Sequence, residues 1–231
     1  MTVTLITGAN KGLGFETARQ LVEAGHTVYV GARDPDRGRI AADKIGARYI
    51  QLDVTDDASV ERATRDLAEA EGHLDVLVNN AGIPGGFKPA SDTVADDLRL
   101  VYETNVFGVV RVIHGMQALL ESSAAPVVVN VSSGLGSLAV TTDPSRFEST
   151  LTGLAYPSSK SALNMLTSQY AKSFPRWRVN MVDPGYTATD LNGHRGTQTI
   201  EQGATVIVRM SLIGADGPTG TFSDAAGTVP W

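Results

Sequence analysis

The chain has 231 residues, of which 42% are hydrophobic and 19% are charged, a composition typical of globular proteins rather than disordered ones. Its 19 Lys and Arg against 25 Asp and Glu leave a net charge of −6, so it lacks the basic surface that binding to a nucleic acid backbone requires. It has no cysteine, which excludes disulfides, thiolate zinc sites and cysteine nucleophiles.

The first residues contain no basic segment followed by a long apolar run, and no run of about 18 apolar residues occurs, so we expect neither a signal peptide nor a membrane span. No Pro-, Gly- or Ser-rich break divides the sequence. We therefore predict a single domain over residues 1–231, located in the cytoplasm.

Short runs rich in Val and Ile predict strands at Val3–Ile6, Thr27–Val30, Ala47–Leu52, Val76–Val78, Val127–Val131, Val179–Val182 and near Thr221. Helical patterns lie between them at Leu13–Ala24, Asp56–Ala70, Val94–Leu120, Tyr156–Ser173 and Thr199–Met210. This alternation predicts an α/β fold, a Rossmann-type doubly wound parallel sheet of about seven strands. The turn-rich tail ends in Trp231, which we expect to pack against the body.

A glycine-rich segment, Thr7–Gly14, separates the first predicted strand from the first helix. Glycines at such a turn let backbone N–H groups approach a pyrophosphate, whose charge the helix N-terminus stabilises. The spacing is GxxxGxG rather than the commoner GxGxxG. We predict a dinucleotide cradle formed by Gly8, Asn10, Lys11, Gly12, Leu13 and Gly14.

The end of the second strand favours NADP(H) over NAD(H). An acidic residue there would bind the ribose 2′-hydroxyl, whereas an Arg accommodates a 2′-phosphate. Here Ala32 occupies the expected acidic position and Arg33 follows it, with Lys11 as a second cation. Asp34 is the open alternative, because it could turn inward or neutralise Arg33.

Together with these features, seven motifs in order make the chain resemble the short-chain dehydrogenase/reductase family, in its NADPH-dependent carbonyl reductase-like branch. They are the TGANKGLG loop, Asp53-Val54, Asn79-Asn80-Ala81-Gly82, Asn105, Ser132-Ser133, Tyr156-Pro157-Ser158-Ser159-Lys160 and Asp183-Pro184-Gly185-Tyr186-Thr187-Ala188-Thr189. The resemblance covers nearly the whole chain. It implies an oxidoreductase that reduces a ketone or aldehyde to an alcohol by hydride transfer.

Tyr156 and Lys160 are four residues apart and share one face of a helix. A nearby ammonium lowers the pKa of a phenol, so we expect the pKa of Tyr156 to fall toward the range useful for general acid–base catalysis. Pro157 indicates that Tyr156 lies at the start of its helix, or that the helix has a local irregularity there. By resemblance, Lys160 also binds the nicotinamide ribose.

The resemblance assigns Ser133 to the substrate carbonyl, with Ser132 as the alternative. It assigns Asn105 to a water in a proton relay to Lys160, against the alternative of a buried Asn that caps its own helix. The interval between Ser133 and Tyr156 is longer than in the family's shorter members, which indicates an insertion within residues 138–155. Such a loop forms a lid or wall, or covers a dimerising surface.

The resemblance extends the cofactor site to residues that follow the third, fourth and sixth strands. Asp53 would accept from the adenine amino group, and Thr187 would meet the nicotinamide carboxamide. Asp183 stands where the family often has Asn, and we do not assign it to the site. The remaining contacts would be Val54, Asn80, Ala81, Gly82, Pro184 and Gly185.

Three questions stay open at this level. One alternative function is a 3-oxoacyl-thioester reductase, which would need a basic patch near the site; Arg176 and Arg178 are the compact basic pair that we consider for it. The other is a non-catalytic NADP(H)-binding sensor. The segment Leu191–Thr199 is a lid or a solvated loop. We expect a small-molecule substrate and a monomer or a homo-oligomer, and no metal, because the four histidines have no ligand spacing.

Overall fold

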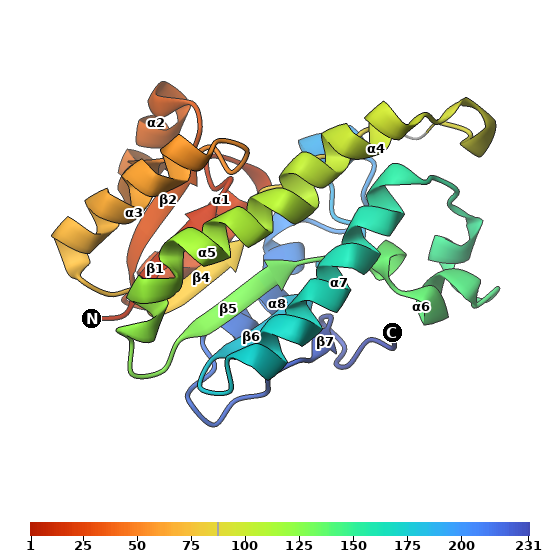
Figure 1. Cartoon of the computed structure of the whole chain (residues 1–231). Coiled ribbons are helices and arrows are strands. Elements are labelled where there is room, and N and C mark those ends of the chain that lie inside the picture. Colours follow the sequence, from red (N-terminus) through yellow and green to blue (C-terminus); the bar gives the residue numbers. More distant parts are fainter. Residues whose placement is uncertain (87) are drawn as a thin grey trace.

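A computed structural model describes residues 1–86 and 88–231. Its centre is a parallel sheet of seven strands in the order β3-β2-β1-β4-β5-β6-β7 (Figure 1). The order reverses direction between β1 and β4, which is the doubly wound arrangement that the sequence predicts. The strands are β1 (Val3–Thr7), β2 (Thr27–Ala32), β3 (Arg48–Gln51), β4 (Val76–Asn79), β5 (Val127–Val131), β6 (Arg178–Val182) and β7 (Phe222–Ser223).

Helices cover both faces of the sheet. One face carries α1 (Gly12–Glu23), α2 (Pro35–Ile45) and α8 (Ile200–Ser211). The other carries α3 (Asp57–Glu71), α5 (Gly108–Glu121) and α7 (Ala155–Ser173), and α4 (Ala95–Tyr102) extends the line of α5. Figure 1 shows α5 and α7 in front of the sheet and α8 behind it.

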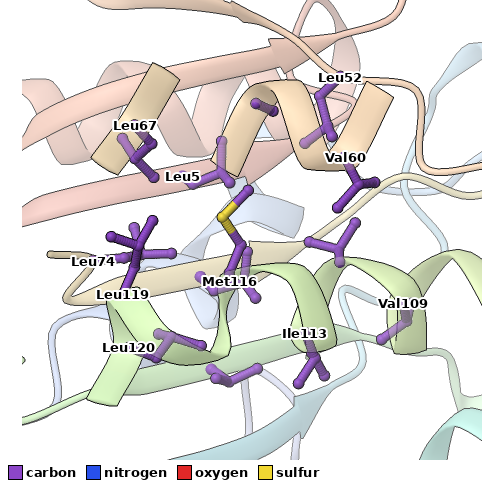
Figure 2. Packing of buried hydrophobic residues seen from close by; sticks show 14 of the residues in the cluster. Leu5, Leu52, Val60, Leu67, Leu74, Val109, Ile113, Met116, Leu119 and Leu120 are labelled. Atoms are coloured by element: carbon purple, nitrogen blue, oxygen red, sulfur yellow. The ribbon is translucent and has the colours of Figure 1, made fainter. Parts of the chain in front are cut away.

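The strands are apolar along their length because both faces are covered. In β1, Leu5 belongs to the core beneath α3 and α5, whereas the next residue, Ile6, belongs to the core beneath α1 and α8. Figure 2 shows the side chain of Met116 of α5 directed toward Leu5 of β1, on the side of α5 that faces α3. Burial of each such side chain contributes about 1.5–3 kcal/mol.

The structure adds a helix that the sequence analysis did not predict, α2. Its ends carry ordinary signals: Asp34 caps the N-terminus by accepting from the backbone N–H groups of Asp36 and Arg37, and Gly46 ends the helix in the left-handed region at φ 70°. The helix is strongly polar, with few apolar residues to reveal its period. That composition hid it from a reading based on hydrophobic periodicity.

The long helix predicted at residues 94–120 is interrupted. Between α4 and α5, Glu103–Phe107 forms a π turn, in which the chain makes i→i+5 rather than i→i+4 hydrogen bonds. Asn105 lies in the middle of this turn. The turn is therefore the local feature that sets the direction of a predicted site residue.

The insertion packs at the β7 edge of the sheet. It contains α6 (Leu138–Thr142) and a 3₁₀ turn at Phe147–Thr150. Val140 packs with Phe222 and with Val229 of the tail, and the backbone N–H of Ala139 donates to the carbonyl of Trp231. The tail does return to the body, but through Val229 and the backbone, since 48% of Trp231 is exposed.

Candidate active site

The predicted site residues gather along the edge of the sheet where the strands end. The glycine loop follows β1, Asn80 follows β4, Ser133 follows β5, and Pro184 and Gly185 lie just after β6. In doubly wound sheets, ligands bind outside the carboxyl ends of the strands, at the point where the strand order reverses. Here that point lies between β1 and β4.

The glycine loop has the shape of an anion cradle. Gly8 and Gly12 have φ angles of 64° and 58°, in the left-handed region that favours glycine. A Cβ on Gly8 would lie 3.0 Å from the Cα of Ala81. The side chain of the N-cap residue Lys11 makes no capping hydrogen bond to α1, and the first turn carries no acidic residue, so an anion at this N-terminus would not compete with either. These features fit a dinucleotide pyrophosphate.

Asn80 holds this loop in place. Its Nδ2 donates to the carbonyls of Thr7 at 2.9 Å and Gly8 at 3.2 Å, while the backbone N–H groups of Asn80 and Ala81 both donate to Oγ1 of Thr7 at 3.0 Å. Gly14 must approach the same amide, since a Cβ there would lie 2.4 Å from Nδ2 of Asn80. Asn80 therefore shapes the cradle from β4.

The end of β2 settles the question about Asp34. Its carboxylate is the N-cap of α2 and lies 3.6 Å from the guanidinium of Arg37, so it is directed away from the strand end. Ala32 is buried and Arg33 is exposed. Neither the inward turn of Asp34 nor its pairing with Arg33 occurs.

A basic hollow of about 440 Å³ adjoins the glycine loop. Its cations are Lys11, Arg37 and Lys44, and Asn10 also lines it. Arg37 and Lys44 are not among the predicted site residues, because both lie in α2, a helix whose polar sequence gives no hydrophobic period. Lys11 is engaged with Asp190, at 2.6 Å between Nζ and Oδ2, and Asp190 also pairs with His194.

The residues after β3 are partly occupied by internal bonds. Oδ1 of Asp53 accepts from the backbone N–H and the hydroxyl of Thr55, at 2.9 and 2.8 Å. The carbonyl of Val54 accepts from Arg111 at 2.7 Å. The predicted adenine contacts of Asp53 and Val54 thus rest on the second carboxylate oxygen and on the remaining backbone groups, and they stay predictions.

Tyr156 and Lys160 meet on one face of α7, as their spacing predicts. Tyr156 is the second residue of the helix, and Pro157 lies in its first turn. Nζ of Lys160 lies 5.6 Å from the centre of the Tyr156 ring and donates to the carbonyl of Val131 at 2.7 Å. Lys160 is buried, whereas Tyr156 is only partly buried.

The electrostatics of Tyr156 differ from our expectation. Burial raises the pKa of Tyr156 well above its ordinary value, Asp183 raises this pKa further, and a hydrogen bond with Ser133 opposes both. The ammonium of Lys160 lies over the ring and is bonded to Val131, so it does not offset burial. Burial also lowers the pKa of Lys160 to about 8. Desolvation of both groups outweighs their mutual effect.

The two serines after β5 have different surroundings. The hydroxyl of Ser132 is buried and donates to Oδ1 of Asn164 at 2.5 Å. Ser133 is half-buried; its hydroxyl accepts from the N–H of Leu135 at 3.3 Å and bonds with Tyr156. Only Ser133 is placed to share a ligand with Tyr156.

Asn105 connects three elements of the site. Its Nδ2 donates to the carbonyl of Ile83 at 3.0 Å and to Oγ of Ser159 at 3.1 Å, and its Oδ1 accepts from the N–H of Ile83 at 2.9 Å. The side chain does not cap its own helix. A Cβ on Gly82 would lie 3.4 Å from Oδ1 of Asn105 and 3.7 Å from Nζ of Lys160, so this glycine faces both groups.

The residues of the turn after β6 form hydrogen bonds mainly within the protein. Gly185 has a φ of 74°, and its N–H donates to Oδ1 of Asp183 at 2.9 Å. The hydroxyl of Thr187 donates to the carbonyl of Pro184 at 3.2 Å and accepts from Nε2 of Gln198 at 2.8 Å. Because this hydroxyl is buried and bonded internally, its contact with a carboxamide stays a prediction.

Across residues 1–86 and 88–231, no group of three or more His, Cys, Asp or Glu side chains lies together in a way that could hold a metal ion. Within the same two ranges, no helix is sufficiently long and apolar to cross a membrane.

Comparisons with known proteins place this chain. The family model for short chain dehydrogenases matches residues 2–200. Salutaridine reductase of Papaver bracteatum is 32% identical over 295 aligned positions, covering 98% of this chain and 95% of that protein. The structure of salutaridine reductase from Papaver somniferum is 29% identical, with a TM-score of 0.85 over 96% of this chain and 99% of that one.

An NADPH-bound carbonyl reductase from chicken fatty liver shares the fold, with a TM-score of 0.87 at 24% identity over the full length of both chains. The order of the motifs, the sheet topology and these similarities agree. The chain belongs to the short-chain dehydrogenase family and is an oxidoreductase that uses a nicotinamide cofactor.

Proposed function

We propose that the enzyme reduces small ketones or aldehydes to alcohols with NADPH, with Tyr156 as the proton donor. The observation that carries this proposal is the convergence of Tyr156, Lys160 and Ser133 at the carboxyl edge of the sheet, beside an open glycine cradle. A sensor that only binds the nucleotide would not need a buried lysine beside a tyrosine, since burial of that charge opposes folding.

The glycine loop and the N-terminus of α1 would hold the pyrophosphate, and Lys160 the nicotinamide ribose. When bound, the reduced nicotinamide supplies a hydride to the carbonyl carbon. Ser133 donates a hydrogen bond to the carbonyl oxygen and orients it toward the hydroxyl of Tyr156. Tyr156 then gives its proton to that oxygen, and Asn105 fixes the loop and helix that surround the pair.

The preference for NADPH rests on charge at the end of β2. Arg33 is exposed, and position 32, where an acidic residue would select NAD(H), carries Ala32. Lys11, Arg37 and Lys44 line the adjoining hollow. A 2′-phosphate carries charge that these cations would stabilise, whereas a 2′-hydroxyl gains little from them. Lys11 would exchange Asp190 for the phosphate.

The substrate region is bordered by aromatic side chains. Phe147 of the insertion and Tyr186 after β6 lie with ring centres 5.7 Å apart, and they are 56% and 38% exposed. Glu148 and Gly185, their neighbours in sequence, approach Gly134 and Asp183 beside the catalytic residues. A substrate with an apolar or aromatic body therefore suits this wall better than a fully polar one.

The alternative, reduction of a 3-oxoacyl thioester on a carrier protein, requires a basic patch near the site. Arg178 begins β6 and donates to the carbonyl of Ala215, and Arg176 contacts the end of α5. Both lie at the opposite edge of the sheet from Tyr156. We therefore favour free carbonyl compounds.

The reaction takes place in the cytoplasm under this proposal, because a chain without cysteine suits a reducing compartment and needs no disulfide. Fluorescence microscopy of the chain fused to a fluorescent protein in its own cells would test the location.

The test of the activity is a panel of ketones, aldehydes and a 3-oxoacyl thioester, assayed by the loss of NADPH or NADH absorbance. We expect reduction of the carbonyl compounds with NADPH, and a loss in kcat of about 10³-fold in Tyr156→Phe with an unchanged Kd for NADPH. Tyr170→Phe, on the same helix but outside the site, is the matched control. Full activity of Tyr156→Phe, or turnover of the thioester alone, would contradict the proposal.

A further inference from the structure

The tail segment, residues 228–231, contacts the insertion at its first helix, α6. The carbonyl of Pro230 accepts from the hydroxyl of Ser137 at 2.7 Å. The carbonyl of Trp231 accepts from the backbone N–H of Ala139 at 3.0 Å. Figure 1 shows the tail running from β7 toward α6. Two carbonyl groups of the tail segment are therefore bonded to the N-terminal end of α6.

Helix α6 depends on contacts from outside itself. It has five residues, and helices this short are unstable without tertiary packing. Its buried side chain is Val140, which packs with Val229 of the tail segment and with Phe222 of β7. The backbone N–H of Val229 donates to the carbonyl of Phe222 at 2.8 Å, so the tail segment is itself fixed to the sheet. The contact between Val229 and Val140 thus joins α6 to the sheet.

Helix α6 leads directly to the aromatic wall of the substrate region. Asp143 ends the helix, and its Oδ1 accepts from the backbone N–H and the hydroxyl of Ser145 at 2.9 and 2.7 Å. The N–H of Arg146 donates to the carbonyl of Asp143 at 3.0 Å. Phe147 comes next, with its ring centre 5.7 Å from that of Tyr186. Because this turn is short and internally bonded, a displacement of α6 would move Phe147.

We propose that Val229 is a specificity-determining residue, because by holding α6 it positions Phe147 against the apolar or aromatic body of the substrate. Only 3% of Val229 is exposed, so it acts through Phe147 and does not contact the substrate itself. This inference rests on the proposed function and extends it to how the substrate wall is held. The glycine cradle follows β1, which β4, β5 and β6 separate from β7, so cofactor binding should not depend on Val229.

The test compares Val229→Ala with wild type on two ketones, one that carries an aromatic ring and one small aliphatic ketone. The substitution removes two methyl groups from the contact with Val140 and keeps the backbone bonds of the tail segment. We expect KM for the aromatic ketone to rise about tenfold with kcat nearly unchanged, because binding of the substrate body is lost. KM for the aliphatic ketone and Kd for NADPH should stay at the wild-type values.

Two further variants separate this role from a general loss of stability. Val3 begins β1 at the opposite edge of the sheet and is 1% exposed, so Val3→Ala is the matched control: it should lower stability but leave both KM values unchanged. Phe147→Ala should raise KM for the aromatic ketone, and adding Val229→Ala should raise it no further, because Val229 acts through Phe147. An equal rise in KM for both ketones, or a further rise in the double variant, would overturn the inference.

A second measurement needs no cofactor and no activity. In hydrogen–deuterium exchange followed by NMR, we expect the amide of Ala139 to be protected in wild type, because it donates to the tail segment. Trypsin should cleave after Arg146 faster in Val229→Ala than in wild type, since α6 is released from the sheet. An unprotected amide of Ala139 in wild type would overturn the inference even if the variant does not fold.

The two proposals fail differently. Absence of NADPH-dependent reduction in wild type would refute the proposed function, and the role of Val229 with it. Reduction of both ketones with the same KM values in wild type and Val229→Ala would refute the role of Val229 and leave the function intact.

Discussion

The two halves of the sheet's carboxyl edge are built on opposite principles. The half around β1, β2 and β4 presents backbone: left-handed glycines, an uncapped helix N-terminus and cations that stand in solvent, such as Lys11 with 61% of its side chain exposed. The half around β5, β6 and α7 presents buried polar side chains, Asn105, Lys160 and Asp183. Under the proposed function, binding of a charged cofactor uses groups that folding tolerates easily, whereas the chemistry uses groups whose burial opposes folding.

The largest effect should separate two adjacent serines of the catalytic half. Ser133→Ala should lower kcat by about 10²–10³-fold, because the substrate oxygen loses a donor. Ser132→Ala should keep kcat but lower the free energy of unfolding by about 1–3 kcal/mol, because Oδ1 of Asn164 loses its buried partner. Steady-state kinetics and denaturant unfolding measure both. The reverse pattern would show that Ser132 contacts the substrate.

Lys160 offers a test of how strongly burial of charge opposes folding. Its pKa of about 8 in the native state lies below the ordinary value of 10.5, so the native protein releases this proton at a pH where the unfolded chain retains it. Stability contributed by Lys160 should therefore rise with pH between about 8 and 10.5, by about 3 kcal/mol in total.

We would compare wild type with Lys160→Met by urea unfolding at pH 7 and pH 10. As the pH rises, the unfolding free energy of wild type should increase relative to that of Lys160→Met. A difference that does not change with pH would mean that Lys160 is solvated in the native protein.

In the half around β1, β2 and β4, two glycine substitutions should distinguish the effect of left-handed backbone from the effect of steric crowding by the added Cβ. Gly8→Ala places a Cβ 3.0 Å from the Cα of Ala81, whereas Gly46→Ala, at a similar φ of 70°, meets nothing within 4 Å. Both variants should lose about 1–2 kcal/mol of stability from left-handed backbone. Only Gly8→Ala should also weaken NADPH binding, by at least about tenfold, in titration calorimetry. Equal Kd values in both variants would place the cofactor elsewhere.

The smallest effect concerns the charges around β2. Arg33→Ala should weaken NADPH binding by about five- to tenfold and leave NADH binding unchanged, because an exposed cation contributes about 1 kcal/mol to a phosphate contact. The fold should be unaffected, since Arg33 is exposed and none of the described side-chain hydrogen bonds or ion pairs involves its side chain. Equal losses for the two cofactors would remove Arg33 from the 2′-phosphate.

Much of the fold was predictable because its signals are local. The seven strands, the glycine loop and the start of α7 close to Tyr156 follow from runs of a few residues, and covered strands leave an unambiguous apolar pattern. The glycine spacing and the Tyr-Lys pair likewise point to the candidate site from neighbours in sequence. Helix α2 escaped because polar residues dominate it, although Asp34 and Gly46 mark its ends.

The rest depends on contacts between distant segments. The pKa of Tyr156 is set by burial and by Asp183, which no spacing of Tyr and Lys reveals. Lys11 and Asp190 are 179 positions apart, yet they form an ion pair beside the cradle. The choice between Ser132 and Ser133 depends on the hydrogen bond between Ser132 and Asn164, two residues that are distant in sequence.

The π turn at Glu103–Phe107 makes the enzyme sensitive to the number of residues in its longest helical stretch. Each residue advances an α-helix by about 100°. Deleting a single residue there would leave α4 and α5 helical, but it would rotate one against the other and swing Asn105 away from Ile83 and Ser159. Evolution can therefore exchange side chains along this stretch far more easily than it can change its length.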